Sequence, residues 1–267
     1  MKYGASAKQN QLSASTCHFI NVLCVKKATP NCFIYGELGL YPLYIERKIR
    51  MFKFWIKILK SKENSYLKKM YYELVVCSMV NPEVITWVTL LKDMLFGYDL
   101  GHYWENQDII SPVIYVNQFR TRVYNAFLQE WQVEVEGTST FRLYKHVKLT
   151  FGFENYLNMY NMSFRIAITK IRLSSHLFYV ERGRWGAKRI EHVNRHCSLC
   201  KTVEDEYHCL VECPKYSNER KGCMPEVLKN RPSMHEFVNI FKCNNEEVLK
   251  QIGLLCFKVM KKHKEDL

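Results

Sequence analysis

Apolar residues return at helical spacing along most of the chain. The clearest example lies between Pro42 and Lys60, where apolar residues recur every three or four positions and line one helical face. The residues of this face are Ile45, Ile49, Phe52, Ile56 and Leu59. Because proline fits the first turn of a helix, Pro42 marks the start, and we expect an amphipathic helix with one buried face.

A second helix is expected after Asn81. This asparagine is a suitable N-cap, Pro82 and Glu83 fit the first turn, and Gly97 lies where the helix would end. The expected apolar face consists of Trp87, Leu90, Leu91, Met94 and Leu95.

A longer helix is predicted from about Asp108 to Glu136, with Gly137 at its end. Four large side chains recur there at near-fourfold steps, and we assign them to the core and not to base stacking: Phe119, Val123, Phe127 and Trp131. Shorter helices are expected over three following segments: Phe141–Val147, Phe153–Met159 and Met162–Leu173.

The C-terminal segment carries its own start signal. The run Asn244-Asn245-Glu246-Glu247 predicts a capped helix. Four apolar residues share a face of that helix: Val248, Ile252, Leu255 and Val259. The lysine-rich end of the chain is expected to fray.

Composition agrees with helices and sets the fold class. Only 11 of 267 residues are glycine and 7 are proline, while 48% are apolar, which suffices for a sizeable core. We therefore predict a mainly α-helical protein: a multi-helix body with a small CCHC zinc-knuckle-like module near the C-terminus. The expected segments are a helical body (1–178), a basic linker with that module (179–222) and C-terminal helices (223–267). The apolar run Val84–Leu91 is too short to cross a bilayer, so no membrane partner is expected.

The charge balance points to a polyanionic partner. The chain has 39 Lys and Arg against 26 Asp and Glu, a formal net charge of +13. More than half of this excess lies between Tyr41 and Tyr72, where five cations recur at helical steps and could contact phosphates. This basic stripe consists of Arg47, Arg50, Lys53, Lys57 and Lys60. The alternative is an ordinary solvated face of a core helix.

Cysteine usage favours a reducing compartment. There are 11 cysteines, an odd number, and most show no tight spacing that would indicate a framework of disulfides. No small-residue cleavage site follows the short apolar stretch near the N-terminus. We therefore expect an intracellular protein, in the nucleus or the cytoplasm.

The strongest chemical signal is the spacing C-x2-C-x7-H-x4-C formed by Cys197, Cys200, His208 and Cys213. Zinc prefers four such ligands in a tetrahedron, and a C-x2-C turn points two thiolates at one ion. The second pair would follow from a short helix near Glu204, with Pro214 opening the next turn. Four protein ligands leave no open position for a catalytic water, so this zinc would be structural. Cys209 remains an alternative ligand, and His192 and His196 are spare imidazoles.

Residues for catalysis are missing from the sequence. Aspartate occurs at five scattered positions, so no adjacent pair is present to hold the two metal ions of a polymerase. Nucleotide-binding and hydrolase motifs are also missing. Ser174-Ser175-His176 is a poor nucleophile and base, since adjacent residues rarely meet in the required geometry. We therefore expect no enzyme activity from this chain alone.

The run from Arg195 to Arg220 resembles a segment near the C-terminus of non-LTR (LINE-type) retrotransposon reverse transcriptases. That segment is cysteine-rich and zinc-knuckle-like, and its more specific features here are Glu204-Asp-Glu-Tyr-His208 and Cys213-Pro-Lys-Tyr216. Three upstream stretches resemble the region between polymerase core and knuckle: Tyr35-Gly-Glu-Leu-Gly-Leu-Tyr-Pro-Leu-Tyr44, Gly152-Phe-Glu-Asn-Tyr-Leu157, and Arg172-Leu-Ser-Ser-His176 with Glu181-Arg-Gly-Arg-Trp185. Roughly residues 15–225 are covered.

The resemblance implies a nucleic-acid-binding function. In that family the polymerase performs target-primed reverse transcription, and its C-terminal part is implicated in binding element RNA or target DNA. This chain lacks the fingers and palm, so it resembles the C-terminal portion only, with RNA or DNA, and a polymerase or other retroelement protein, as implied partners. The family commonly has an apolar residue where this chain has Cys209.

We expect the contacts to come from the segment Glu181–Arg189, which we interpret as a loop, and from the residues around it. Basic residues would contact phosphates and a tryptophan would stack on an unpaired base. These residues are Arg182, Arg184, Trp185, Lys188, Arg189 and Arg195. The alternatives are a zinc-stapled helical protein-interaction module and a decayed retrotransposon relic without activity.

Overall fold

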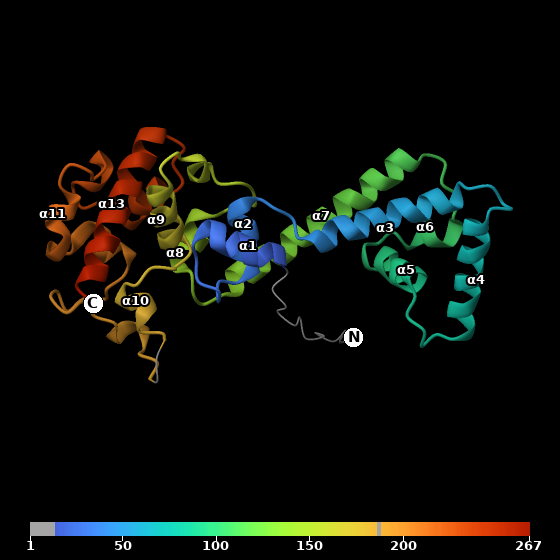
Figure 1. Cartoon of the computed structure of the whole chain (residues 1–267), viewed down its shortest axis with the longest axis horizontal. Coiled ribbons are helices and arrows are strands. Elements are labelled where there is room, and N and C mark those ends of the chain that lie inside the picture. Colours follow the sequence, from blue (N-terminus) through green and yellow to red (C-terminus); the bar gives the residue numbers. More distant parts are fainter. Residues whose placement is uncertain (1–13, 186–187) are drawn as a thin grey trace. The chain divides into compact units, whose positions relative to one another are not determined.

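The computed structural model describes residues 14–185 and 188–267, and these are 65% helical with no strands. The mainly α fold class is therefore confirmed (Figure 1). The elements are α1 (Ala14–Leu23), α2 (Asn31–Leu38), α3 (Leu43–Leu59), α4 (Tyr66–Val80), α5 (Trp87–Gly97), α6 (Gly101–Asn106), α7 (Pro112–Gly137), α8 (Arg142–Val147), η1 (Asn155–Asn158), α9 (Met162–Arg172), α10 (Tyr179–Arg182), η2 (His192–Asn194), η3 (His208–Glu212), η4 (Pro214–Tyr216), α11 (Ser217–Arg220), η5 (Glu226–Leu228), α12 (Met234–Ile240) and α13 (Glu246–Glu265). None of the helices in the described part is long and apolar enough to cross a membrane.

Contacts group the chain into two compact units. Unit 1 comprises residues 1–40 and 134–267, and unit 2 comprises residues 41–133. These bounds do not coincide with the three segments that composition indicates, because the N-terminal helices associate with the C-terminal half and not with the residues that follow them.

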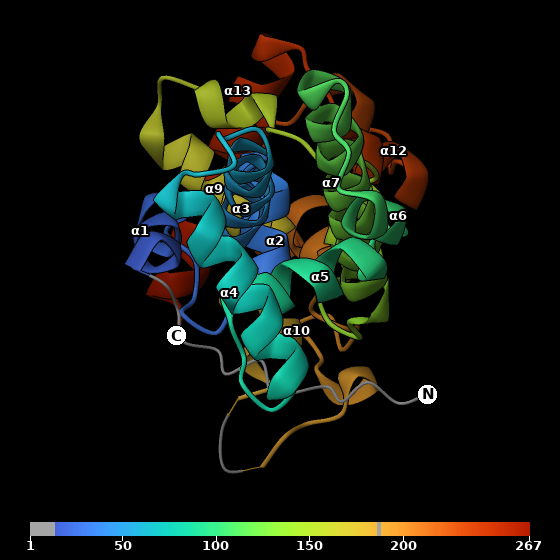
Figure 2. The same ribbon diagram turned by 90° about the vertical axis from the view of Figure 1, so that its right-hand side faces the viewer.

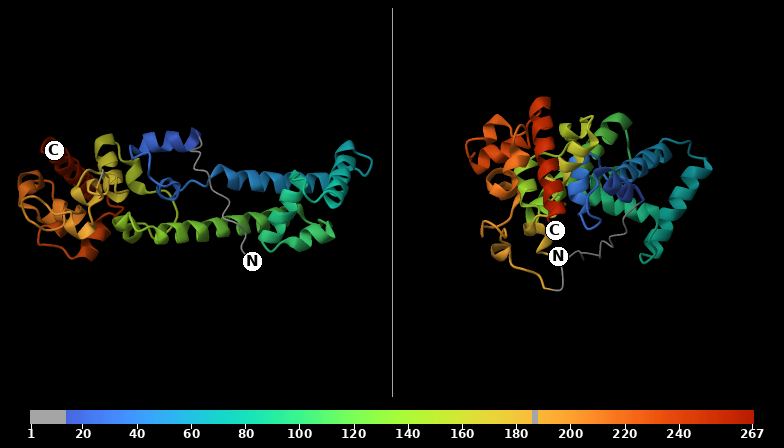
Figure 3. Two further views of the ribbon diagram at one scale, coloured as in Figure 1. Left: turned by 90° about the horizontal axis from the view of Figure 1, so that it is seen from below. Right: turned by 60° about the vertical axis from the view of Figure 1, so that its left-hand side comes forward.

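Unit 2 is built on α3 and the first part of α7, which lie side by side (Figure 3). The predicted buried face of α3 is confirmed for Ile45, Ile49, Phe52 and Ile56. Phe52 stacks on Phe119 of α7 with ring centroids 4.3 Å apart. The other large side chains assigned to the α7 core are also buried: Val123, Phe127 and Trp131.

The helix expected after Asn81 begins later than the capping signal indicated. Asn81 instead ends α4, which the sequence analysis did not identify. Thr86 is the N-cap of α5, since its side chain and that of Thr89 bond reciprocally to the other residue's backbone N–H. The two helices lie next to each other (Figure 2). The end at Gly97 is confirmed.

Unit 1 is centred on the packing of α9 against α13. Gly253 makes this close approach feasible, because a Cβ there would lie 2.6 Å from Cβ of Phe164. Asn245 caps α13 as predicted by accepting from the backbone of Glu247 and Val248. The buried side chains of the α13 face include Ile252, Leu255 and Val259.

Two local predictions in unit 1 were wrong. The segment Phe153–Met159 contains only the single 3-10 turn η1 and no α-helix. The lysine-rich end is not frayed, because α13 continues to Glu265 and Asp266 pairs with both Lys215 and Lys262. The short helix α8 and the longer α9 are present where the pattern predicted them.

Candidate metal centre and basic segment

A tight loop holds the first two cysteines of the motif. Its two arms are joined by backbone hydrogen bonds from Glu204 to Arg195 (2.8 Å) and from Cys197 to Thr202 (2.7 Å). Lys201 closes the loop by donating its N–H to the Cys197 carbonyl at 3.0 Å, with its own backbone in the left-handed region at φ 59°. The C-x2-C pair is therefore on a turn, as its spacing predicted.

A π-helical turn brings the second pair of residues together. The N–H of Cys213 donates to the His208 carbonyl at 2.8 Å, a bond that spans five residues. In an α-helix, residues five apart point about 140° away from each other, because each residue advances about 100°. The wider turn returns Cys213 to the side of His208. Its start is fixed by Asp205, whose side chain accepts from the His208 N–H at 2.8 Å.

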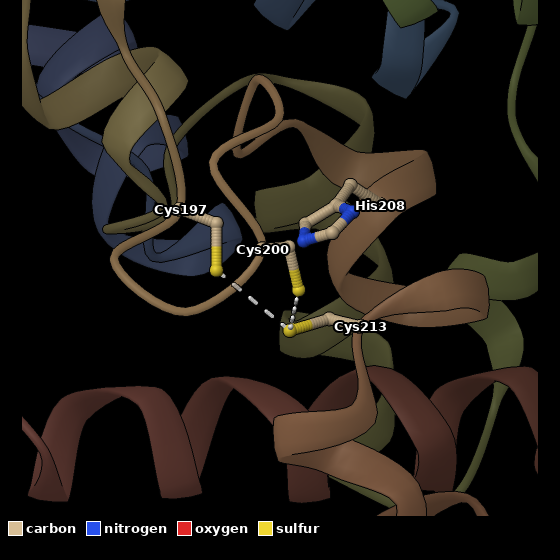
Figure 4. Close-up of side chains that lie close together, drawn as sticks. All are labelled: Cys197, Cys200, His208 and Cys213. Atoms are coloured by element: carbon tan, nitrogen blue, oxygen red, sulfur yellow. Dashed lines mark hydrogen bonds between the residues drawn. The ribbon is translucent and has the colours of Figure 1, made fainter.

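The four motif residues converge on one point (Figure 4). One potential ligand atom from each of Cys197, Cys200, His208 and Cys213 lies within 4.8 Å of all the others. Sγ of Cys213 lies 3.8 Å from Sγ of Cys197 and 3.7 Å from Sγ of Cys200. Tetrahedral zinc with bonds of about 2.3 Å places its sulfur ligands about 3.8 Å apart, so the thiols already have the spacing of a metal site.

The imidazole of His208 is oriented toward such an ion. Its Nδ1 is within hydrogen-bond distance of Thr202 Oγ1 (3.2 Å) and Glu212 Oε2 (3.4 Å). Its Nε2 is buried and has no hydrogen-bond partner among the described residues. A metal-bound histidine commonly donates its second ring N–H to a carboxylate or hydroxyl, so the orphaned Nε2 is the atom that would bind the metal.

The thiols differ in their readiness to ionise. Burial raises the pKa of the Cys197 thiol, but hydrogen bonds from the backbone, first that of Cys200, outweigh burial and lower the pKa to about 7. Burial raises the pKa of Cys213 to about 12 and also raises that of Cys200. A bound cation would favour all three thiolates, and this group can hold a metal such as zinc.

Cys209 lies outside the cluster. Its side chain is completely buried next to His208 in sequence, and burial raises its pKa well above the usual range. Buried neutral thiols behave as small apolar groups, so Cys209 fills the core as the apolar residue expected at this position would. The alternative ligand set is therefore not supported. The ten cysteines from Cys24 to Cys256 are free thiols.

The acidic triplet Glu204-Asp205-Glu206 connects the Cys3His cluster to neighbouring segments. Glu204 accepts from the backbone N–H of Tyr179 at 2.7 Å, Glu206 is 2.9 Å from His176 Nε2, and Asp205 begins the π-helical turn. No hydrogen bond joins His176 to either neighbouring serine among the described residues. The apparent nucleophile and base of Ser174-Ser175-His176 are thus not paired.

Tyr216 of η4 connects the cluster to α13. Its hydroxyl lies 2.6 Å from Nδ1 of His263, whose Nε2 is 3.1 Å from the Leu177 carbonyl. Burial lowers the pKa of His263, so the ring is neutral near pH 7, with Nδ1 accepting and Nε2 donating. Pro214 begins η4 as predicted.

The predicted nucleic-acid contacts near the cluster fall into two groups. Arg182, Trp185, Lys188 and Arg189 are exposed, with Trp185 at 56%. Arg195 is 5% exposed and donates to the carbonyls of Ile190 and Val180, so its guanidinium is held within the protein. The expected loop is partly helical, because α10 includes Arg182, and residues 186–187 lie outside the described part.

Arg184 is also partly committed within the protein. Its guanidinium donates to both carboxylate oxygens of Glu181, at 3.0 and 3.1 Å. The ion pair retains Arg184 at the edge of the basic segment but neutralises part of its charge. It is therefore a weaker candidate for a phosphate contact than the exposed cations on either side.

The basic stripe is exposed along α3 and its C-cap Lys60 in unit 2, as predicted for all five residues: Arg47, Arg50, Lys53, Lys57 and Lys60. The last three line a groove of about 680 Å³ together with Arg120 of α7. The aliphatic residues that line this groove include Ile56, Val113 and Val116. The stripe therefore borders an apolar surface.

Sequence reasoning missed Arg142 and the side chains that orient His208. Arg142 lies 2.9 Å from Nε2 of His192, fifty residues away. Helical periodicity places Arg142 on α8 but carries no information about a partner so distant in sequence. Glu212, four residues after His208, could have been identified from its spacing on a helical turn.

Comparison of the chain with protein-family models, curated proteins and solved structures gives no match.

Proposed function

We propose that this chain is a non-catalytic nucleic-acid-binding protein in which a structural zinc ion orders the presentation of a basic, tryptophan-containing segment. The observation that supports it best is the connection between the Cys3His cluster and this segment. Arg195, two residues before Cys197, holds the carbonyls of Val180 and Ile190, which lie on either side of the exposed cations. A metal ion that orders the loop around Cys197 would therefore also fix, through Arg195, the two ends of the basic segment.

Cys197, Cys200, Cys213 and Nε2 of His208 would hold the zinc ion. Zinc bound by four protein ligands supplies folding free energy and leaves no position for a reacting water. The cluster consequently acts as a structural element in this proposal.

The exposed residues of the basic segment would make the contacts. Arg182, Lys188 and Arg189 would neutralise phosphates. This electrostatic contribution dominates the affinity for nucleic acid and depends strongly on salt concentration. Trp185 supplies a ring on which an unpaired base stacks, which favours single-stranded RNA or DNA. The net charge of +13 adds long-range attraction for the polyanion.

The resemblance to LINE-type reverse transcriptases supports the same function. We propose that the chain corresponds to the C-terminal region of such a protein, and that it works in a reducing compartment inside the cell. The two motifs Glu204–His208 and Cys213–Tyr216 favour this origin. The free thiols favour a reducing compartment.

The decisive experiment measures zinc content and single-stranded RNA binding on the same samples. We expect one zinc per chain and salt-sensitive binding in the wild type. The Arg182→Ala/Lys188→Ala/Arg189→Ala variant should keep its zinc but bind at least about tenfold more weakly, because three phosphate contacts are lost. Arg184 is left in place, since its removal would leave the buried carboxylate of Glu181 unpaired. Binding by folded wild type that does not change with salt would refute the proposal.

A specific observation favours a second candidate, a protein-interaction module. The groove between α3 and α7 is lined by aliphatic residues and by Lys53, Lys57, Lys60 and Arg120, and no aromatic ring among the described residues lines it for base stacking. An acidic amphipathic helix matches both features. A labelled peptide with leucines on one face and flanking glutamates should bind the wild type and lose affinity for Val116→Asp. Equal binding of a scrambled peptide would exclude this function.

A further inference from the structure

A small pocket in unit 1 gathers basic side chains from separate parts of the chain. Its volume is about 160 Å³, enough for several water molecules. Arg142 comes from α8, His192 from η2, and Arg184, Arg189 and Arg195 from the basic segment and the loop that leads to the metal cluster. The first of these is some forty residues before the others, so folding alone brings them together.

The two carboxylates at this pocket are already engaged by other groups. Glu181 accepts two hydrogen bonds from Arg184, and Glu206 is 2.9 Å from Nε2 of His176. They are thus held at the wall by their own partners. Neither carboxylate forms an ion pair with the remaining arginines of the pocket in the described residues.

Three guanidinium groups remain without a carboxylate partner in the part of the chain that the structure describes: Arg142, Arg189 and Arg195. Arg195 bonds to carbonyl groups, and Arg142 to the ring of His192, so neither contact neutralises its charge. Burial, followed by the cations of Arg142 and Arg195, lowers the pKa of His192, which keeps that ring neutral near pH 7. The pocket therefore holds an excess of positive charge.

We propose that this pocket binds a phosphomonoester, the phosphorylated end of a nucleic-acid strand. Four arginines and two glutamates line the pocket, which leaves two positive charges with His192 neutral. A phosphomonoester carries about −1.5 to −2 charges at pH 7, whereas each internal phosphodiester carries one. Arginine suits this ligand because its planar fork binds phosphate oxygens in pairs. The identity of the ligand as a strand end rests on the proposed nucleic-acid-binding function.

The pocket wall is continuous with the metal cluster, which makes the phosphate site dependent on the metal. Arg195 reaches the pocket from the loop arm that hydrogen-bonds to Glu204, and Glu206 reaches it from the next turn. Removing the metal should loosen this loop and weaken binding of the strand end.

Oligonucleotides that differ only at their ends test the inference. Single-stranded oligouridylates with an internal fluorophore carry a 5′-phosphate, a 3′-phosphate or hydroxyls at both ends, and their affinities are measured by fluorescence anisotropy. One phosphorylated form should bind the zinc-loaded protein about tenfold more tightly than the hydroxyl form, the effect of a charge-assisted contact. The 5′ and 3′ arms identify the end, and an inorganic phosphate titration followed by ³¹P NMR distinguishes a free phosphate site.

The Arg142→Gln/Arg189→Gln variant should lose this preference. Both side chains are exposed, so the fold and the zinc content should stay unchanged. The matched control, Arg47→Gln/Arg50→Gln on α3, should keep the preference, because those cations lie in the other unit.

Two results would separate this inference from the proposed function. Equal affinities for all three oligonucleotides would overturn the phosphomonoester site and leave nucleic-acid binding intact. Saturable phosphate binding that requires Arg142 and Arg189, without binding of any oligonucleotide, would refute the proposed function and support an anion site alone. Absence of both kinds of binding in folded, zinc-loaded protein would refute both.

Discussion

Arg172 and Glu37, 135 residues apart in the sequence, form an ion pair in which neither side chain is exposed to solvent. The guanidinium donates to both carboxylate oxygens, at 2.6 and 3.3 Å. It also donates to the Phe241 carbonyl at 2.6 Å and pairs with Glu154 at 2.8 Å. One buried arginine thus joins α2, α9, the segment before η1 and the end of α12.

Replacing Arg172 with methionine should strongly destabilise unit 1. The substitution keeps much of the side-chain volume but leaves the carboxylate of Glu37 buried without its counter-ion, and loss of one partner of a buried pair costs about 3–5 kcal/mol. Chemical denaturation monitored by circular dichroism measures the free energy of unfolding.

The control for this variant is Arg50→Met. Arg50 pairs with Glu46 one helical turn away on an exposed surface, and such pairs contribute about 0–1 kcal/mol. Similar losses of unfolding free energy in the two variants would show that the buried Arg172 pair contributes no more to stability than the exposed Arg50 pair.

The sequence predicted individual helices better than their associations. Apolar residues three or four positions apart were sufficient to predict α3, α7, α9 and α13, because one face of each helix is buried. It missed α4, in which only Lys68 and Tyr71 are buried, so that no apolar stripe marks the helix. The Glu37–Arg172 pair could not be predicted either, since no local spacing relates residues that far apart.

Loss of two ligands should remove the metal, whereas loss of the neighbouring cysteine should not. We expect zinc analysis of purified protein to give one ion for the wild type and for Cys209→Ala, and none for Cys197→Ser/Cys200→Ser. The reason is that the first two cysteines face the cluster and Cys209 faces the core. A full complement of zinc in the double variant would exclude this site.

Metal affinity should rise with pH. Metal binding must displace the protons of Cys200 and Cys213, because their pKa values are raised, to about 12 for Cys213. Cys197, with a pKa lowered to about 7, contributes a third proton only below neutrality. The logarithm of the apparent affinity should therefore increase by about two per pH unit near pH 8, and more steeply near pH 6.

Competition with a chromophoric chelator at several pH values measures this dependence. A chelator whose own protonation is known supplies the reference at each pH. An affinity for zinc that is constant between pH 6 and 8 would show that metal binding releases no thiol protons. This result would contradict the assigned ligand set.

The members of the Cys3His cluster were predictable from the sequence because their spacing is local. The π-helical turn that aligns His208 with Cys213 was not, since a five-residue interval is compatible with several turns until Asp205 fixes the start. The functions of Glu204 and Glu206 depend on Tyr179 and His176, which lie in a different part of the sequence. Spacing therefore indicates the ligands, and only the fold shows what supports them.

The Tyr216→Phe variant should weaken the attachment of the cluster to α13. It removes the hydroxyl that lies 2.6 Å from Nδ1 of His263 and leaves that nitrogen buried without a donor. An unsatisfied buried acceptor costs about 1–3 kcal/mol, so thermal unfolding should occur at a lower temperature. Zinc stoichiometry should stay at one, because Tyr216 is not a ligand. An unchanged melting temperature would show that this hydrogen bond adds no stability.

Trp185→Ala should separate base stacking from charge in nucleic-acid binding. The ring is 56% exposed, with Lys26 Nζ 5.8 Å from its centroid, so its removal leaves no cavity in the core. Stacking of one base contributes about 1–3 kcal/mol, which corresponds to a loss of affinity for single-stranded RNA of roughly fivefold or more. The slope of affinity against salt should stay unchanged, because no phosphate contact is lost. Trp185→Phe should keep most of the affinity, and a change in slope without a change in low-salt affinity would contradict the stacking role.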